Sequence, residues 1–315
     1  MKKGPLVLLL AAFAALAALY SVVVPPFETP DEIWHYAVIQ QLAGGGGLPV
    51  SAPQTTARWR QQGVQPPGYY LAAAALTGWI DQSDFPALYE RTNPHAAIGV
   101  PDLLNRSFFL HYEDDGWPWR GSFLALHLSR LFSVALATLT LWATFMGLRL
   151  LVGDGRALLA TALFAFIPQF LFIAGAASND NAINAVAALT LWRLAALLRA
   201  LDPAAPPAAR RTLALRHYAP LGLLVGLALL AKGSGLWLPL LLLLALALAS
   251  RQRRSWRPLA EGAALALPIA ALVAGWWFAR NWQLYGDPVA NNIWLSNILL
   301  RSEPLTVRRL SLIHI

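Results

Sequence analysis

Seven apolar runs dominate this 315-residue sequence, and they determine the solvent in which the chain can fold. A transmembrane helix needs about 20 predominantly apolar residues, and several of the runs reach that length. Hydrophobic residues make up 57% of the chain and charged residues only 13%, which is more apolar than a soluble domain of this size. The sequence therefore predicts an all-α fold, a polytopic transmembrane helical bundle formed as a single domain over residues 1–315.

The predicted helices cover, approximately, residues 5–24, 122–148, 157–177, 182–198, 218–231, 236–249 and 259–279. The first run is long and lacks a persuasive cleavage site, which favours an anchor helix over the alternative of a signal peptide. The fifth and sixth runs are short, and Lys232 with a Gly-Ser-Gly segment separates them. This spacing allows either two tilted helices or a re-entrant pair.

Basic residues indicate the orientation of the helices, because Lys and Arg concentrate in cytoplasmic loops. If the N-terminus lies inside, 13 of the 24 basic residues fall in inside segments, accompanied only by Asp154 and Asp202. The long loop 25–121 holds ten acidic and five basic residues, which suits the opposite face. We therefore expect a multi-pass protein of the cytoplasmic (inner) membrane, N-terminus inside, whose net charge of +8 reflects topology and no nucleic-acid partner.

This topology places the polar motifs on the extracytoplasmic face, namely TPDEIWH (29–35), QPPGYY (65–70), SNDN (178–181), KGSG (232–235) and RNWQLYGDP (280–288). The cytoplasmic loops hold no comparable motif. Cysteine is absent, which excludes disulfides, a thiol nucleophile and a Cys-ligated metal. We expect a site assembled on the extracytoplasmic face, above the helical bundle.

The first of these motifs places two carboxylates and a histidine just outside the first helix. Adjacent carboxylates can raise one pKa and so provide a general base, or bind a divalent cation through their oxygens. Asp31, Glu32 and His35 are therefore the candidate catalytic residues, and a divalent cation at Asp31 and Glu32 is the candidate cofactor. A structural interpretation competes, because Thr29 and Glu32 also match a capping box that opens an amphipathic helix over residues 33–42.

Further motifs supply candidate substrate-binding residues. Tyr69 and Tyr70 begin an apolar segment predicted to lie in the membrane interface, where they either anchor it or form a platform for a sugar or prenyl chain. Four basic side chains can together hold a phosphate at the membrane boundary, or each can simply snorkel or pair. These four are His127, Arg130, Lys232 and Arg280. Asn179, Asp180 and Asn281 complete the set, with helix capping and a turn as their structural alternatives.

Taken together, the motifs resemble bacterial membrane proteins of the GT-C glycosyltransferase superfamily, near the protein mannosyltransferase and aminoarabinose transferase branch. The chain also looks like an uncharacterised bacterial membrane protein family related to that branch. The likeness is spread over nearly the whole chain. It rests on Asp31 and Glu32, on Pro66, Pro67 and Tyr70, on a Pro-led span ending in SNDN, on a span ending in Lys232, and on RNWQLYGDP.

The resemblance implies a polyprenyl-phosphate sugar donor and an inverting transfer to a glycan, lipid or protein acceptor outside the cytoplasmic membrane. By this analogy Asp31 is the base for the acceptor hydroxyl, Glu32 assists or binds a cation, and the basic residues hold the lipid phosphate. Such enzymes generally carry more helices and often a C-terminal extracytoplasmic domain, so we expect a C-terminally truncated chain whose last residues, 309–315, continue no recognised pattern.

Two other functions remain open at the level of the sequence. A transporter or flippase for lipid-linked sugars predicts binding groups near mid-membrane in broken helices, together with an internal repeat. A non-catalytic membrane scaffold predicts that replacing Asp31 leaves every assay unchanged, and the capping-box interpretation keeps this alternative open.

Overall fold

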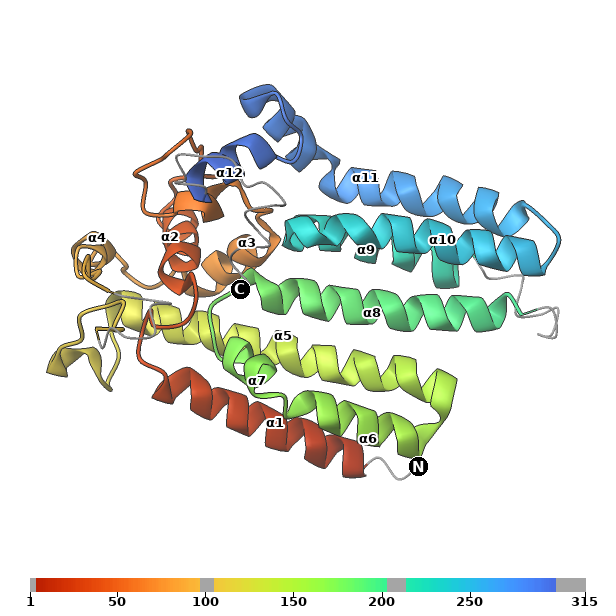
Figure 1. Ribbon diagram of the computed structural model, residues 1–315, viewed down its shortest axis with the longest axis horizontal. Helices are drawn as coiled ribbons and strands as arrows, with labels where there is room; N and C mark the ends of the chain where they lie inside the picture. The colour runs from red at the N-terminus through yellow and green to blue at the C-terminus, as the bar shows by residue number, and fades with distance from the viewer. Residues whose placement is uncertain (1–3, 97–104, 203–213, 299–315) are drawn as a thin grey trace, which may run out of the picture.

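The computed structural model describes residues 4–96, 105–202 and 214–298, so the predicted tail 309–315 lies outside the described residues. Within the described ranges every regular element is helical, and Thr92 and Phe109 form only an isolated antiparallel bridge. Long helices lie side by side in a bundle, and shorter helices gather at one end of it (Figure 1). The predicted all-α fold is confirmed for these residues.

Five helices in the described part of the chain are long and apolar enough to cross a membrane. They are α1 (Gly4–Val23), α5 (Gly121–Val152), α8 (Asn179–Ala200), the run formed by η5 (Gly233–Leu236) with α10 (Trp237–Gln252), and α11 (Arg257–Tyr285). Large apolar side chains such as Leu8, Leu240 and Leu272 stay exposed along them, as expected for surfaces that face lipid. Five of the seven predicted spans thus correspond to such helices.

The other two predicted spans differ from continuous full-length helices. The run 157–177 is divided into α6 (Asp154–Ala165) and α7 (Pro168–Ala174), which are bent by 71°. The prediction of one straight helix is wrong here because Pro168 lacks a backbone N–H and disfavours helical geometry at Ile167, which is extended. The run 218–231 becomes a π-helical turn, η4 (Ala214–Tyr218), followed by the short helix α9 (Ala219–Ala231). Counting the bent pair as one gives six spans, so the count of seven stays a prediction.

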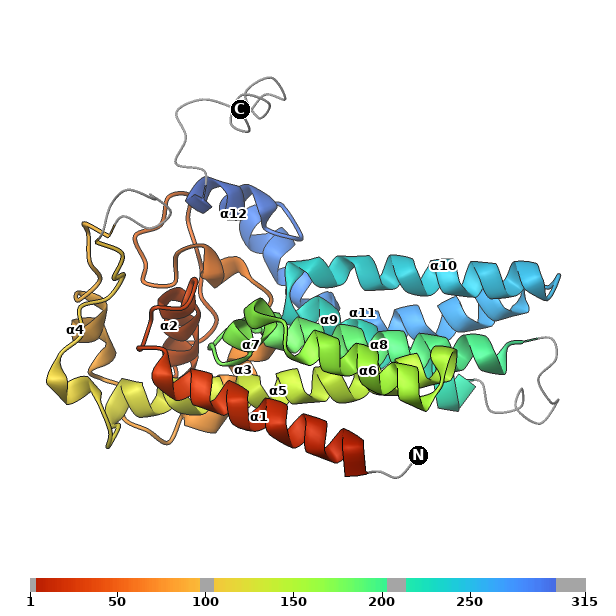
Figure 2. The same ribbon diagram turned by 60° about the horizontal axis from the view of Figure 1, so that its bottom comes forward.

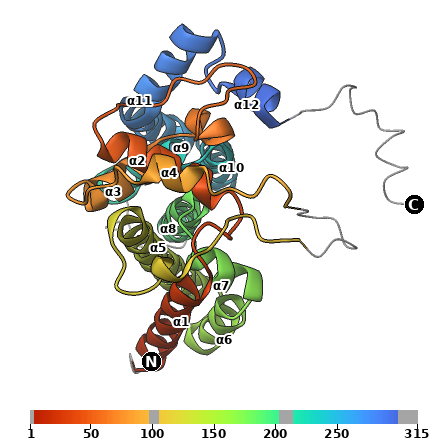
Figure 3. The same ribbon diagram turned by 90° about the vertical axis from the view of Figure 1, so that its left-hand side faces the viewer.

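Two central helices divide the bundle into two sides. Viewed along the bundle, α5 and α8 lie between α1, α6 and α7 on one side and α9, α10 and α11 on the other (Figure 3). The pair α5 and α8 also forms the most extensive helix contact of the described chain. Residues that follow or precede these two helices are therefore placed where both sides of the bundle meet.

The short elements form what we call the loop end of the bundle (Figures 1 and 2). They are α2 (Glu32–Ala43), η1 (Arg60–Val64), α3 (Gly68–Thr77), α4 (Phe85–Tyr89), η2 (Glu113–Asp115) and α12 (Asn291–Ile298). An aromatic core made of Phe27, Tyr36, Phe85, Phe109 and Phe123 packs beneath part of them. The Arg-rich turn between α10 and α11 lies at the opposite end, which agrees with the predicted separation of charge. Which end faces the cytoplasm stays a prediction.

Candidate functional site

The two adjacent carboxylates of the first motif lie in opposite surroundings. Asp31 precedes α2 and is exposed, whereas Glu32 is the first residue of α2 and is almost fully buried. Asp31 has a φ of 60°, in the left-handed region that disfavours most residues with a Cβ but that Asp and Asn tolerate. This turn in the backbone directs neighbouring side chains to different places, so the two carboxylates do not act as a matched pair.

Arg130 of α5 holds the Glu32 side chain beneath the loop end. Its Nη2 lies 2.6 Å from Oε2 of Glu32 and its Nε lies 2.8 Å from Oε1, and both side chains are 0% exposed. The remaining guanidinium donors bind backbone carbonyls at the end of α1, those of Ser21, Val24 and Pro25, at 2.7–3.0 Å. All five donors of the guanidinium are thus used, so Arg130 is not free to hold a phosphate.

The oxygens of Glu32 accept two further hydrogen bonds, from the backbone N–H of Phe27 at 3.0 Å and from that of Ala177 at 2.8 Å. The buried pair therefore joins the end of α1, the start of α2, α5 and the segment before α8. The capping-box interpretation is wrong, because Glu32 turns inward and the Thr29 hydroxyl has no hydrogen-bond partner among the described residues. A cation predicted for both carboxylates would have only Asp31 available to it.

Asp31 faces a polar cluster built from three other segments. Gln62 of η1 donates from Nε2 to Oδ2 of Asp31 at 3.1 Å. Partial desolvation raises the pKa of Asp31, hydrogen bonding from Gln61 opposes the shift, and the charges of Lys232 and Asp180 act in opposite directions. A carboxylate that is exposed and has a raised pKa is suited to accept a proton from a bound hydroxyl.

The cation in this cluster is Lys232, which ends α9 and lies 2.6 Å from Oδ1 of Asp180 in the first turn of α8. Ser178 caps α8 by accepting from the backbone N–H of Asp180 at 3.2 Å, so the predicted capping role of SNDN is confirmed. The acidic side chain in the first turn also complements the helix dipole. The ion pair is partly exposed, with side-chain accessibilities of 27% for Lys232 and 42% for Asp180, and thus remains open to a ligand.

His35 belongs to a second layer beneath Asp31. Its Nδ1 lies 2.8 Å from the hydroxyl of Tyr70, and this hydroxyl lies 3.5 Å from Oε1 of Gln62, whose amide contacts Asp31. Burial first, and then the charge of Lys232, lowers the pKa of His35 to about 3, so the ring is neutral at physiological pH. The chain of contacts from His35 to Asp31 orients the carboxylate from below.

An apolar cavity of about 320 Å³ lies on the other side of Lys232. Its walls come from the segment before α3, from the turn between α9 and α10, and from α11 and α12, with Val64, Pro66, Leu229, Phe278 and Trp294 among the lining residues. Gly68 allows the backbone of α3 to approach α9, since a Cβ there would lie 2.7 Å from the carbonyl of Leu230. Lys232 therefore links a polar cluster that contains Asp31 to a mainly apolar cavity.

Four other predicted site residues make contacts within the fold. Tyr69 and Tyr70 are buried, so they neither anchor the chain at headgroup level nor form a platform, and Tyr69 bonds Ser133 at 2.8 Å instead. Arg280 donates to the carbonyl of Pro49 at 2.7 Å, and the amide of Asn281 donates to the carbonyl of Pro288 at 3.2 Å. These contacts fasten connecting segments to the end of α11.

His127 and Asn179 complete the predicted set. His127 stacks on Trp119 with ring centroids 3.6 Å apart, and neither of its ring nitrogens has a partner in the described part of the chain. Asn179 is fully buried, and its amide atoms are likewise without partners among the described residues. Of the four basic side chains predicted to share a phosphate, only Lys232 influences the pKa of Asp31, and it is paired with Asp180.

Sequence reasoning missed Gln61 and Gln62, which contact Asp31 and complete the cluster. The only signal was their place, four and three residues before the QPPGYY motif, in a segment with no periodic pattern. Among the described residues no group of three or more His, Asp or Glu side chains is placed to hold a metal ion. No protein-family model matches the chain, and no curated protein matches it in sequence.

Proposed function

We propose that this chain is an integral-membrane glycosyltransferase, or the N-terminal part of one, that uses a polyprenyl-phosphate sugar on the extracytoplasmic face. The observation that carries the proposal is the position of Lys232, which borders both the apolar cavity and the cluster that contains Asp31. A lipid-linked sugar needs an apolar space, a cation for its phosphate and a base for the acceptor. These three features meet at Lys232.

The proposed reaction displaces the lipid phosphate by an acceptor hydroxyl. Asp31 removes the hydroxyl proton while the hydroxyl oxygen forms a bond to the anomeric carbon of the donor. The bond between that carbon and the phosphate oxygen breaks, and the electron pair leaves with the polyprenyl phosphate. Lys232 stabilises the charge that develops on this leaving group, at the edge of the apolar cavity. Attack opposite the leaving group inverts the anomeric carbon.

The other cluster residues support these two groups. Gln61 and Gln62 orient the Asp31 carboxylate, and Asp180 holds Lys232 until a phosphate replaces it as the partner. Glu32 and Arg130 fix the start of α2 from below without touching the substrate. A divalent cation at this place, as predicted from the sequence, would bind through Asp31.

The proposal is tested by comparing Asp31→Asn with the wild type in transfer from radiolabelled polyprenyl-phosphate sugars to a membrane extract. Asn tolerates the left-handed backbone of residue 31, so the change removes charge with little effect on geometry. We expect transfer to fall at least ~100-fold, the size typical of losing a general base. Glu90→Gln is the matched control, because Glu90 is an exposed carboxylate at the loop end outside the cluster.

Lys232→Met supplies a second readout. We expect it to weaken binding of the donor, measured by retention of labelled donor on the purified protein, while Glu90→Gln retains binding. Unchanged transfer in Asp31→Asn would remove Asp31 from the reaction. Donor retention without consumption by any variant, the wild type included, would favour a carrier over an enzyme.

A transporter of lipid-linked sugars is the second candidate, and the bent pair of α6 and α7 favours it because transporters use discontinuous helices. The break, however, carries Phe166 and Ile167, both exposed and apolar. Transporter breaks present helix ends and polar groups to the substrate. The polar cluster at the loop end therefore carries more weight than the bend.

A further inference from the structure

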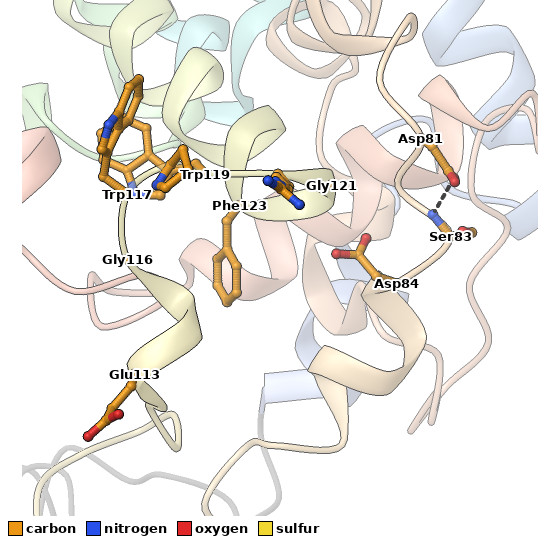
Figure 4. A pocket seen from close by; sticks show the side chains of 11 residues that line it. Asp81, Ser83, Asp84, Glu113, Gly116, Trp117, Trp119, Gly121 and Phe123 are labelled. Atoms are coloured by element: carbon orange, nitrogen blue, oxygen red, sulfur yellow. Dashed lines mark hydrogen bonds between the residues drawn. The ribbon is translucent and has the colours of Figure 1, made fainter.

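A second cavity, of about 710 Å³, opens at the start of α5. Figure 4 shows Trp117 and Trp119 on one side of it, Asp81 and Asp84 on the other, and Phe123 between them. Phe123 belongs to the aromatic core that also contains Phe27, the residue whose backbone N–H bonds Glu32. The cavity thus borders the aromatic core, and its lining includes none of the residues of the Asp31 cluster.

The position of the cavity along α5 places it in water. Arg130 of α5 bonds the carbonyls at the end of α1, which marks where that apolar span stops. Gly121, the first residue of α5, lies nine positions earlier, a distance of ~14 Å along a helix at about 1.5 Å per residue. Gly121 lines the cavity, so this wall stands beyond the level where interfacial tryptophans anchor to headgroups, whereas Trp119, stacked on His127, lies nearer to the membrane.

The walls of the cavity are held in place by specific contacts. Asp84 accepts from the backbone N–H of Ser122 at 3.1 Å and from its hydroxyl at 2.7 Å. Gly121 has a φ of 53°, and a Cβ there would lie 2.4 Å from Oδ2 of Asp84, so only glycine permits this approach. Trp119 is supported by its stacking on His127. These contacts fix the shape of the cavity within the fold.

The lining combines apolar ring surface with hydrogen-bond acceptors. Trp117 is 79% exposed, and its ring meets that of Trp119 at 90° with centroids 5.2 Å apart. The charged residues are three carboxylates, those of Asp81, Asp84 and Glu113, and a single guanidinium, that of Arg120. Cavities with apolar walls and a few polar groups that fix orientation are typical ligand sites.

We propose that this cavity binds a saccharide that carries no anionic group. The C–H face of a sugar ring packs on an exposed indole, and its hydroxyls donate to carboxylate oxygens, which accept strong hydrogen bonds. The excess of carboxylates repels uronates and phosphosugars, whereas neutral and amino sugars are accepted. In the setting of the proposed transferase, the cavity would hold a distal part of a glycan acceptor, although binding itself does not depend on that function.

The test measures saccharide binding by the purified chain in lipid nanodiscs, which avoid the sugar headgroups of maltoside detergents. Chitotriose and mannotriose serve as neutral probes, glucosamine as an amino sugar, trigalacturonate as an anionic probe and choline as a cation that is not a sugar. Saturation-transfer NMR detects contact, and titration gives affinities. We expect the neutral and amino sugars to bind and trigalacturonate not to bind.

Trp117→Ala should weaken binding of the neutral probe at least ~10-fold, as expected when a central aromatic contact is truncated. Trp79→Ala is the matched control, because Trp79 is 73% exposed and does not line the cavity. Asp31→Asn should bind the probes normally, which separates this site from the proposed reaction. Failure of the wild type to bind any sugar, equal binding by Trp117→Ala, tight binding of trigalacturonate, or binding of choline alone would each overturn the proposal.

Discussion

Two regions at the loop end contain the same kinds of charge but in opposite surroundings. In the buried junction, Glu32 and Arg130 are 0% exposed and every guanidinium donor is used by a partner within the chain. In the open cluster, Asp31 is exposed, and Lys232 and Asp180 are paired but still accessible. Asp31 and Glu32 are neighbours in the sequence, yet one belongs to each region.

The difference teaches that the number of partners a charge has within the fold decides whether it can act on a ligand. A buried ion pair with complete hydrogen bonding cannot exchange partners without a large loss of free energy. A partly exposed pair contributes little to stability, so a ligand can replace one member at low cost. The buried junction therefore determines where α2 begins, and the open cluster retains the capacity for chemistry.

The largest effect is expected for Arg130→Met. The change leaves Glu32 as a buried carboxylate without its cation and leaves the carbonyls at the end of α1 without donors. Breaking such a pair costs about 3–5 kcal/mol of folding free energy. We expect a strong fall in the thermal unfolding midpoint of the purified protein, whereas Arg120→Met, at an exposed residue, should behave as the wild type. A similar midpoint for both variants would contradict the role assigned to the buried junction.

The adjacent carboxylates provide a sharper comparison. Glu32→Gln should destabilise the fold by about 1–3 kcal/mol or more, because charged hydrogen bonds to Arg130 are weakened inside the protein. Asp31→Asn should not destabilise it. The pKa of Asp31 is raised in the folded state, so ionising this carboxyl costs folding free energy, and the wild type loses stability as the pH rises through that pKa. Asn is neutral at every pH, so Asp31→Asn does not have this loss.

The measurement is the unfolding midpoint of both variants between acidic and neutral pH. We expect Asp31→Asn to match the wild type at acidic pH and to equal or exceed it near neutrality. Glu32→Gln should be less stable than the wild type near neutral pH, because its hydrogen bonds to Arg130 are weakened. If Asp31→Asn loses more stability than Glu32→Gln, the assignment of the two residues to different regions is wrong.

A smaller effect on stability, with a clear effect on pH dependence, is expected for Lys232→Met. The ion pair with Asp180 is partly exposed, so its loss should cost no more than about 1 kcal/mol. The charge of Lys232 lowers the pKa of Asp31, and its removal raises that pKa further. The acidic limb of any Asp31-dependent transfer should therefore move to higher pH. A pH–rate profile with an unmoved limb would separate Asp31 from the transfer step.

Composition and apolar run length predict the helical bundle well, because the membrane requires long apolar helices irrespective of detail. The bend between α6 and α7 was signalled by Pro168, but run length alone concealed it. The structure of the loop end was harder to predict from the sequence. Whether a polar side chain faces a ligand or the interior depends on contacts between segments more than 90 positions apart, such as those of Glu32 with Arg130 and Ala177.

The candidate site shows the same limit. Asp31, Asp180 and Lys232 were predicted from motifs at helix ends, and helix ends at one side of a bundle do converge. Arg280 was predicted by the same reasoning, but its guanidinium donates hydrogen bonds to backbone carbonyls in the segment after α2. That segment has no periodic pattern in the sequence. The sequence could not show which basic side chains bond to backbone carbonyls, as Arg280 does, and which stay accessible, as Lys232 does.

The smallest effect is expected at Thr29, where the capping-box interpretation and the structure disagree. The Thr29 hydroxyl is buried and has no hydrogen-bond partner among the described residues, so Thr29→Val removes a polar group that stabilises nothing. We expect the free energy of unfolding to change by less than about 0.5 kcal/mol or to rise slightly, since an unsatisfied buried group is itself unfavourable.

Ser178→Ala is the matched control for this test, because Ser178 does cap a helix by accepting from the backbone N–H of Asp180. Loss of a true cap costs about 1 kcal/mol, so the control should unfold at a lower temperature than Thr29→Val. A loss of equal size in both variants would restore Thr29 as the cap of α2. It would also require Glu32 to leave Arg130 for the helix start, because a capping box uses the same carboxylate. Thr29→Val therefore tests the inward position of Glu32 without altering either charge of the buried pair.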